Sequence, residues 1–160
     1  MSINIPTTDR DDAIQCLKSR SLSYKCALET VAKHGYDSYL VELIIQNYRC
    51  SLKMAMNLSE HTRNHEMVIV AIIKKTKICS LRKAFVLAAD TGEQTVLYEA
   101  IMDREDWKTG PIDECVRLYC KFINKGPDHP LAKQILGRDL SPTKWSSLYS
   151  ELLVYPRTKL

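Results

Sequence analysis

Apolar residues recur every three to four positions along most of the 160-residue chain, which is the spacing of one helix face. The segment after Gly110-Pro111 shows this best, because the 3.6-residue period is matched by Ile112, Cys115, Val116, Tyr119, Phe122 and Ile123. Shorter matches lie within residues 13–17, 27–32, 40–45, 52–58, 81–101 and 130–153. We therefore predict an all-α protein of about eight helices, arranged as a compact bundle or a short solenoid.

Capping residues and sparse breakers indicate where these helices begin and end. Glycine and proline together number only 11, and most of them fall at the ends of the periodic segments. Thr7 and Thr8 predict the first N-cap, His34-Gly35 ends the second helix, and Ser141-Pro142 begins the last one. The last helix is expected to face inward through Trp145, Leu148, Tyr149, Leu152 and Leu153.

One apolar segment, residues 67–73, is compatible with two structures. Its β-branched side chains suit a buried strand, and a continuous apolar run carries no periodicity that decides between strand and helix. Because the neighbouring segments are helical, we predict a buried helix. An apolar stripe left exposed on this segment would favour a homodimer.

The composition is that of a globular protein, with 45% apolar and 26% charged residues. The length suits one helical domain over residues 1–160, with tails at 1–8 and 155–160. The first ten residues lack the apolar core of a signal peptide, and the six cysteines lie in helical patterns, so we expect free thiols. The expected location is the cytoplasm, with the nucleus as the alternative, and no apolar run is long enough for a membrane span.

Three segments resemble one another, namely Cys26-Ala-Leu-Glu, Cys50-Ser-Leu-Lys and Cys79-Ser-Leu-Arg, at offsets of 24 and 29 residues. Each opens a predicted helix that pairs with a second one. Ala27-Leu28 through Ala32-Lys33-His34-Gly35 and then Leu40-Val41-Glu42-Leu43-Ile44 resembles an ankyrin repeat, and residues 84–97 echo it, although the ankyrin Thr-Pro-Leu-His opening is absent. The resemblance covers about half of the chain and implies stacked helix pairs that bind protein.

The net charge of +4 is mild but unevenly distributed. Residues 63–83 hold six basic groups against Glu66, and residues 90–106 hold six acidic groups against Arg104. The basic stretch 74–83 is the strongest candidate for binding a partner or phosphate, through Lys74, Lys75, Lys77, Arg82 and Lys83. Few aromatic residues interleave with these cations, which argues against stacking on single-stranded bases.

Residues that could support catalysis are scarce. His61 and His65 could supply two metal ligands on one helix face, but Asn64 is a good N-cap and would separate them. The sequence has no Cys-x-x-Cys, no Gly-rich phosphate loop and no Gly-x-Ser-x-Gly. We therefore expect neither an enzyme nor a bound metal or cofactor.

The segment Ser141-Pro142-Thr143-Lys144 has two interpretations. It matches a pattern that proline-directed kinases accept, which makes Ser141 a candidate phosphorylation site. It also matches the start of a helix, with serine as the N-cap and proline in the first position, and this structural role is favoured.

These features predict a non-catalytic intracellular adaptor that binds another macromolecule. A protein is the first expected partner, and the alternative is a small RNA-binding protein that uses the basic stretch on phosphates. A pathogen factor that intercepts a host protein would carry the same features.

Overall fold

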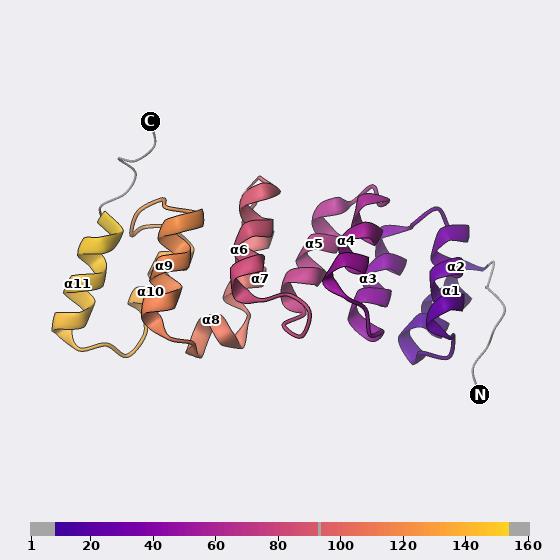
Figure 1. The fold of residues 1–160 in the computed structure, drawn as a ribbon, viewed down its shortest axis with the longest axis horizontal. Helices are drawn as coiled ribbons and strands as arrows, with labels where there is room; N and C mark the ends of the chain where they lie inside the picture. Colours follow the sequence, from indigo (N-terminus) through magenta and orange to yellow (C-terminus); the bar gives the residue numbers. More distant parts are fainter. Residues whose placement is uncertain (1–8, 93, 154–160) are drawn as a thin grey trace. The chain divides into compact units, whose positions relative to one another are not determined.

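The computed structural model describes residues 9–92 and 94–153 (Figure 1). Within these residues it contains eleven helices and no strand, which confirms the all-α prediction and shows that about eight helices is too few. The chain forms two compact units, Met1–Cys79 (unit 1) and Ser80–Leu160 (unit 2), where the sequence analysis expects one domain. The predicted tails at 1–8 and 155–160, with the cap at Thr7 and Thr8, lie outside the described residues.

Unit 1 is built from five helices, α1 (Arg10–Ser19), α2 (Tyr24–Lys33), α3 (Ser38–Asn47), α4 (Leu52–Glu60) and α5 (His65–Lys74). α3 packs against both α1 and α5, so these three helices form a row. α2 packs against α3, and α4 packs against α3 and α5. The helix pairs α2–α3 and α4–α5 therefore stack beside each other around a shared apolar core.

Unit 2 is built from six helices, α6 (Leu81–Asp90), α7 (Thr95–Met102), α8 (Glu105–Thr109), α9 (Ile112–Phe122), α10 (Pro130–Leu136) and α11 (Pro142–Leu153). α9 packs against both α6 and α11, while α7 packs against α6 and α10. The short helix α8 has no counterpart in the sequence prediction. It carries Trp107, which is only 2% exposed and donates from Nε1 to Oε1 of Gln134 at 2.8 Å.

Serine caps set the register of the helix pairs. Ser23, Ser51 and Ser80 each accept a hydrogen bond from the backbone N–H three positions onward, at the starts of α2, α4 and α6. These serines are 28 and 29 residues apart, so alignment on the cysteines is out of register in its first copy. Cys26 is the third residue of α2, whereas the other two cysteines precede the capping serine. The hydroxyl decides the register, because it satisfies an N–H that has no partner within the helix.

Residues 67–73 lie in α5, which confirms the predicted helix. Val68, Ile69 and Ile72 are fully buried in unit 1. The exposed stripe that would favour a homodimer is therefore not found on this segment.

Both ends of the described chain differ in detail from the prediction. Asp9 caps α1 through its carboxylate, which accepts from the backbone N–H of Asp11 at 2.9 Å. In α11, Leu148 and Leu152 are buried as predicted. Trp145 and Leu153 are 40% and 55% exposed, because the packing partners of this last helix, α9 and α10, cover only part of its circumference.

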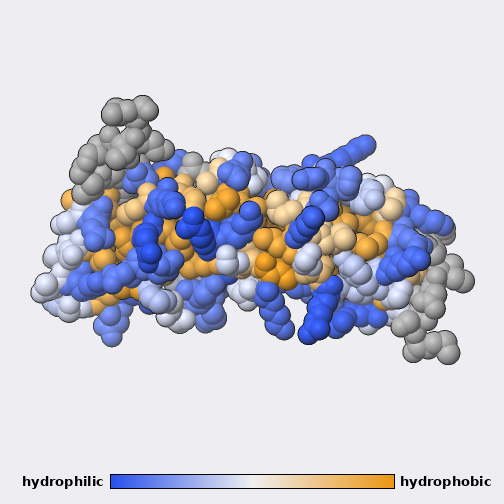
Figure 2. All heavy atoms as spheres, viewed as in Figure 1, coloured by the Kyte–Doolittle hydropathy of each residue, from blue (hydrophilic) through white to orange (hydrophobic). Residues whose placement is uncertain are grey.

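On the face drawn in Figure 2, protruding hydrophilic side chains surround areas of apolar surface in each unit. Across residues 9–92 and 94–153, no helix combines the length and the apolar character needed to cross a membrane.

Candidate anion-binding pocket

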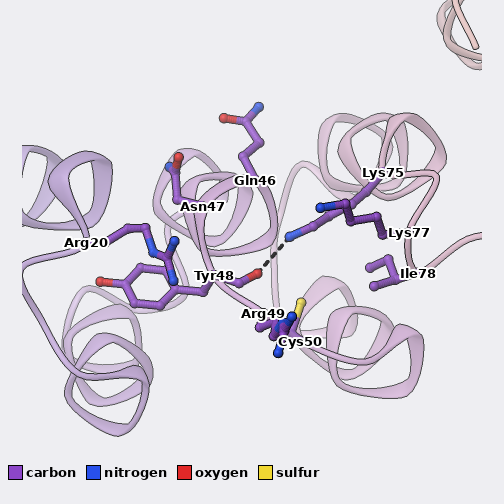
Figure 3. A pocket seen from close by; sticks show the side chains of 9 residues that line it. All are labelled: Arg20, Gln46, Asn47, Tyr48, Arg49, Cys50, Lys75, Lys77 and Ile78. Carbon is purple, nitrogen blue, oxygen red and sulfur yellow. Dashed lines mark hydrogen bonds between the residues drawn. The ribbon is translucent and has the colours of Figure 1, made fainter.

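A pocket of about 720 Å³ opens in unit 1 beside the C-terminal end of α3 (Figure 3). Its walls come from the segments that directly follow α1, α3 and α5. The lining residues are Arg20, Gln46, Asn47, Tyr48, Arg49, Cys50, Lys75, Lys77 and Ile78. Four of them are cations and none is an acid, so the pocket is strongly positive.

The row of helices explains why these cations meet. Arg20, Tyr48 and Lys75 are the first residues after α1, α3 and α5, and all three line the pocket. The C-terminal ends of the three helices therefore lie at the same edge of unit 1. Helix C-termini carry partial negative charge, which favours lysine and arginine nearby, so part of this clustering has a structural cause.

Lys75 has that structural role. Its Nζ donates to the carbonyl oxygen of Tyr48 at 2.7 Å and also to the carbonyl oxygen of Ile45 (Figure 3). These carbonyls belong to the last turn of α3, where no intrahelical N–H remains to bind them. Lys75 is half-buried, and this burial lowers the pKa of its ammonium group below the ordinary value. It remains a cation of the pocket, but its hydrogen bonds hold α3.

Arg20 is positioned by an aromatic ring. Its guanidinium carbon lies 5.8 Å from the centre of the Tyr48 ring, and Tyr48 is fixed in turn because its hydroxyl donates to the carbonyl oxygen of Leu22 at 3.0 Å. Arg20 also closes α1 with a left-handed backbone, at a φ of 56°. Its side chain extends over the ring toward the pocket, as Figure 3 shows.

The remaining cations have no acidic partner. In the part of the chain that the structure describes, none of Arg20, Arg49 and Lys77 forms an ion pair with a carboxylate. Lys75 and Lys77 extend toward Tyr48 from one side of the pocket and Arg20 extends toward it from the other (Figure 3). The pocket can therefore hold an anionic group between cations from separate segments.

The predicted basic stretch does not form one site. Lys75 and Lys77 line the pocket, while Lys74 lines a separate, smaller pocket that contains Glu42. Arg82 and Lys83 lie on α6 in unit 2, where the Arg82 guanidinium carbon is 5.5 Å from the centre of the Phe122 ring. The boundary between the two units thus falls within the stretch 74–83.

Sequence reasoning missed Arg20 and Arg49, although a signal for both was present. Once the capping serines are aligned, a basic residue precedes each of them by two or three positions. Arg20 precedes Ser23, Arg49 precedes Ser51, and Lys77 precedes Ser80. The cysteine alignment hid this regularity because its first copy is out of register.

The two histidines lie on either side of a helix boundary, as the N-cap interpretation of Asn64 predicts. His61 ends α4, His65 begins α5, and the Asn64 side chain accepts from the backbone N–H of Met67. The His61 ring packs against Tyr36 with the ring centres 4.7 Å apart. Among the described residues, no cluster of three or more histidine, cysteine, aspartate or glutamate side chains could hold a metal ion.

The other two candidate chemistries have structural explanations. Ser141 accepts a hydrogen bond at its Oγ from the backbone N–H of Lys144 at 3.1 Å, which confirms its predicted capping role. All six cysteines are free thiols. Burial raises the pKa of the Cys50 thiol in the pocket, which disfavours the nucleophilic thiolate.

The fold and this pocket define a class of protein: stacked short helix pairs with a cationic recess at one edge of a unit. A scan against protein-family models found no match, and searches of curated proteins and of solved structures also found none. The function is therefore argued from the pocket itself.

Proposed function

We propose that this chain is a non-catalytic binding protein that holds an acidic segment of a partner protein in the pocket of unit 1. The observation that carries the proposal is the lining, which has four cations and no carboxylate. A recess with charge of one sign focuses the electrostatic field and raises the local concentration of oppositely charged groups. An acidic segment supplies such groups on a flexible chain that can enter the recess.

A protein partner is favoured over nucleic acid by the aromatic content of the pocket. Single-stranded nucleic acids bind by stacking bases on exposed aromatic rings, in addition to charge. Tyr48 is the pocket's one aromatic residue, is only 6% exposed, and has Arg20 over its ring. It therefore offers no face to a base. A duplex gains affinity from many phosphate contacts along its length, and a single recess provides few of them.

Binding without catalysis is supported by the chemistry of the lining. Cys50 is the pocket's one thiol, and burial raises its pKa. No histidine or carboxylate lines the pocket to act as a general base for it.

The test is direct binding of a fluorescent acidic peptide of alternating glutamate and serine to the full chain, followed by anisotropy at two salt concentrations. The pocket variant combines Arg20→Glu, Arg49→Glu and Lys77→Glu. Its control combines Lys33→Glu, Lys53→Glu and Arg63→Glu, which change the charge equally at exposed positions outside this pocket.

We expect salt to weaken binding and the pocket variant to lose about tenfold or more in affinity, while the control loses much less. Equal losses in the two variants would show that net charge alone drives binding and would overturn the proposal. A single-stranded RNA that binds more tightly than the peptide, and only when the pocket is intact, would assign the pocket to nucleic acid instead.

A further inference from the structure

The pocket carries more positive charge than one carboxylate can neutralise. Lys75 is partly compensated, because its ammonium group donates to the C-terminal carbonyls of α3. Arg20, Arg49 and Lys77 come from three separate connections and have no carboxylate partner within the described part of the chain. One aspartate or glutamate brings a single negative charge, whereas a phosphate monoester brings nearly two and three acceptor oxygens.

Two of these three cations are arginines, whose chemistry suits phosphate. A guanidinium presents its N–H groups as a planar fork that can donate two parallel hydrogen bonds to a phosphate. Arg20 is also pre-positioned, since its guanidinium stacks on the buried Tyr48 ring, which is held by the hydrogen bond to Leu22. A side chain that is already ordered loses less entropy when the ligand binds.

The shape of the site limits how such a phosphate could be presented. The recess, of about 720 Å³, has cations on separate segments around it rather than along a line. A group that protrudes from a backbone can enter it, whereas the evenly spaced phosphates of a nucleic acid would meet the cations one at a time.

We infer that the pocket accepts a phosphoserine or phosphothreonine side chain carried by the acidic segment of the partner. This inference rests on the proposed function and narrows it from acidic segments in general to phosphorylated ones. Arg20, Arg49 and Lys77 bind the phosphate oxygens, and Lys75 holds the floor of the pocket by fixing the end of α3.

The experiment compares three synthetic acidic peptides that differ only at the central residue, which is serine, glutamate or phosphoserine. Affinities for the full chain are measured by anisotropy at physiological salt. The phosphopeptide is expected to bind about tenfold or more tightly than the other two. Millimolar O-phosphoserine, but not serine, is expected to displace it.

Variants locate this preference. Arg49→Glu is expected to remove the advantage of the phosphopeptide, whereas Lys53→Glu, on the exposed face of α4, is expected to keep it. Lys77→Glu provides a second pocket variant in case Arg49→Glu fails to fold, which circular dichroism would reveal.

Each other outcome overturns the inference in a distinguishable way. Equal binding of all three peptides, lost in the pocket variants, would overturn the phosphate preference and leave the proposed function intact. Absence of binding by every peptide would overturn both. A single-stranded RNA that displaces the phosphopeptide and itself binds more tightly, with dependence on Arg49, would assign the pocket to nucleic acid.

Discussion

The ammonium group of Lys75 lies 2.7 Å from the carbonyl oxygen of Tyr48, to which it donates a hydrogen bond across 27 positions of sequence. With its second bond, to Ile45, it links the connection after α5 to the last turn of α3. These hydrogen bonds separate the roles of the pocket cations. Lys75 stabilises the pocket, while Arg20, Arg49 and Lys77 present donors to a ligand.

Replacing Lys75 with methionine should therefore destabilise unit 1. Lys75→Met keeps most of the apolar stem but leaves two carbonyls at the end of α3 without their donor, at a cost of about 1–3 kcal/mol. Urea unfolding followed by circular dichroism measures the change. The matched control is Lys77→Met, which removes an exposed ammonium from the same pocket and should cost less than about 0.5 kcal/mol. Equal effects of the two variants would contradict the capping role.

The serine caps give a second prediction. Ser51→Ala should cost about 1 kcal/mol, because the backbone N–H of Met54 at the start of α4 loses its acceptor. Ser51→Asp restores an acceptor and places negative charge at the helix N-terminus, so it should recover most of the stability. Unfolding midpoints in urea, by circular dichroism, test the pair. A midpoint unchanged by Ser51→Ala would mean that the cap contributes nothing to stability.

Trp107 should be the most sensitive position tested in unit 2. Trp107→Ala removes a buried indole, its contact with the Phe85 ring at a centre-to-centre distance of 5.4 Å, and the hydrogen bond to Gln134. The expected cost is about 3–5 kcal/mol. Both tryptophans of the chain lie in unit 2, so the fluorescence of Trp145 can follow unfolding of this unit in the variant. Val96→Ala, at an exposed position of α7, is the control and should change stability by less than about 0.5 kcal/mol.

Unit 2 should lose stability in acid through Asp106. Hydrogen bonds from the Arg104 guanidinium, at 2.7 and 2.9 Å, are the main reason why the pKa of Asp106 is lowered. The folded pKa lies below the unfolded value of about 3.9, so the carboxylate contributes stability above about pH 4. This contribution is lost as the pH falls through the folded pKa. Asp106→Asn should therefore destabilise the protein at neutral pH, and the difference from the natural chain should shrink toward pH 2–3.

The Asp106 prediction is measured by thermal unfolding of both proteins across this pH range. A difference in stability that stays constant with pH would contradict it, because the asparagine does not titrate.

Glu42 should behave in the opposite way. Burial raises the pKa of its carboxyl group, and its buried Oε2 accepts no hydrogen bond from any described residue. Since the folded pKa lies above the unfolded value of about 4.3, the charged form is disfavoured in the folded chain at neutral pH. Stability associated with this group is present below the unfolded pKa and is lost as the pH rises through the folded pKa. Glu42→Gln should therefore raise stability at pH 7 by up to about 1 kcal/mol and lose this advantage near pH 4. Parallel urea titrations at the two pH values provide the measurement.

The helices were largely predictable from the sequence, because their signals are local. The apolar period of residues 112–123 and the Gly110-Pro111 boundary place α9 correctly, and Pro130 and Gly137 bound α10. α8 was missed, because five residues are too few to show a period and its one apolar side chain, Trp107, is buried through contacts with other helices. Trp145 was assigned inward because the pattern gives a helix face but not the extent of its neighbours.

The site was only partly predictable. Lys75 and Lys77 were found because they belong to a run of cations that is visible along the chain. Arg20 and Arg49 are single basic residues in short connections, and their significance appears only when α1, α3 and α5 are packed as a row. Arg82 and Lys83 are neighbours of that run in sequence, yet they belong to the other unit.

The sequence by itself determined that the chain is helical, where most helices begin and end, and that no familiar catalytic motif is present. These features depend on hydrogen bonds and side-chain spacing within about four residues of any position. The tertiary structure decided which cations meet. Packing of α3 between α1 and α5 brings together residues as far apart as Arg20 and Lys77, and burial then assigns Lys75 to the helix end and its neighbours to the ligand. Such long-range packing depends on how whole helix faces fit together, which no local pattern records.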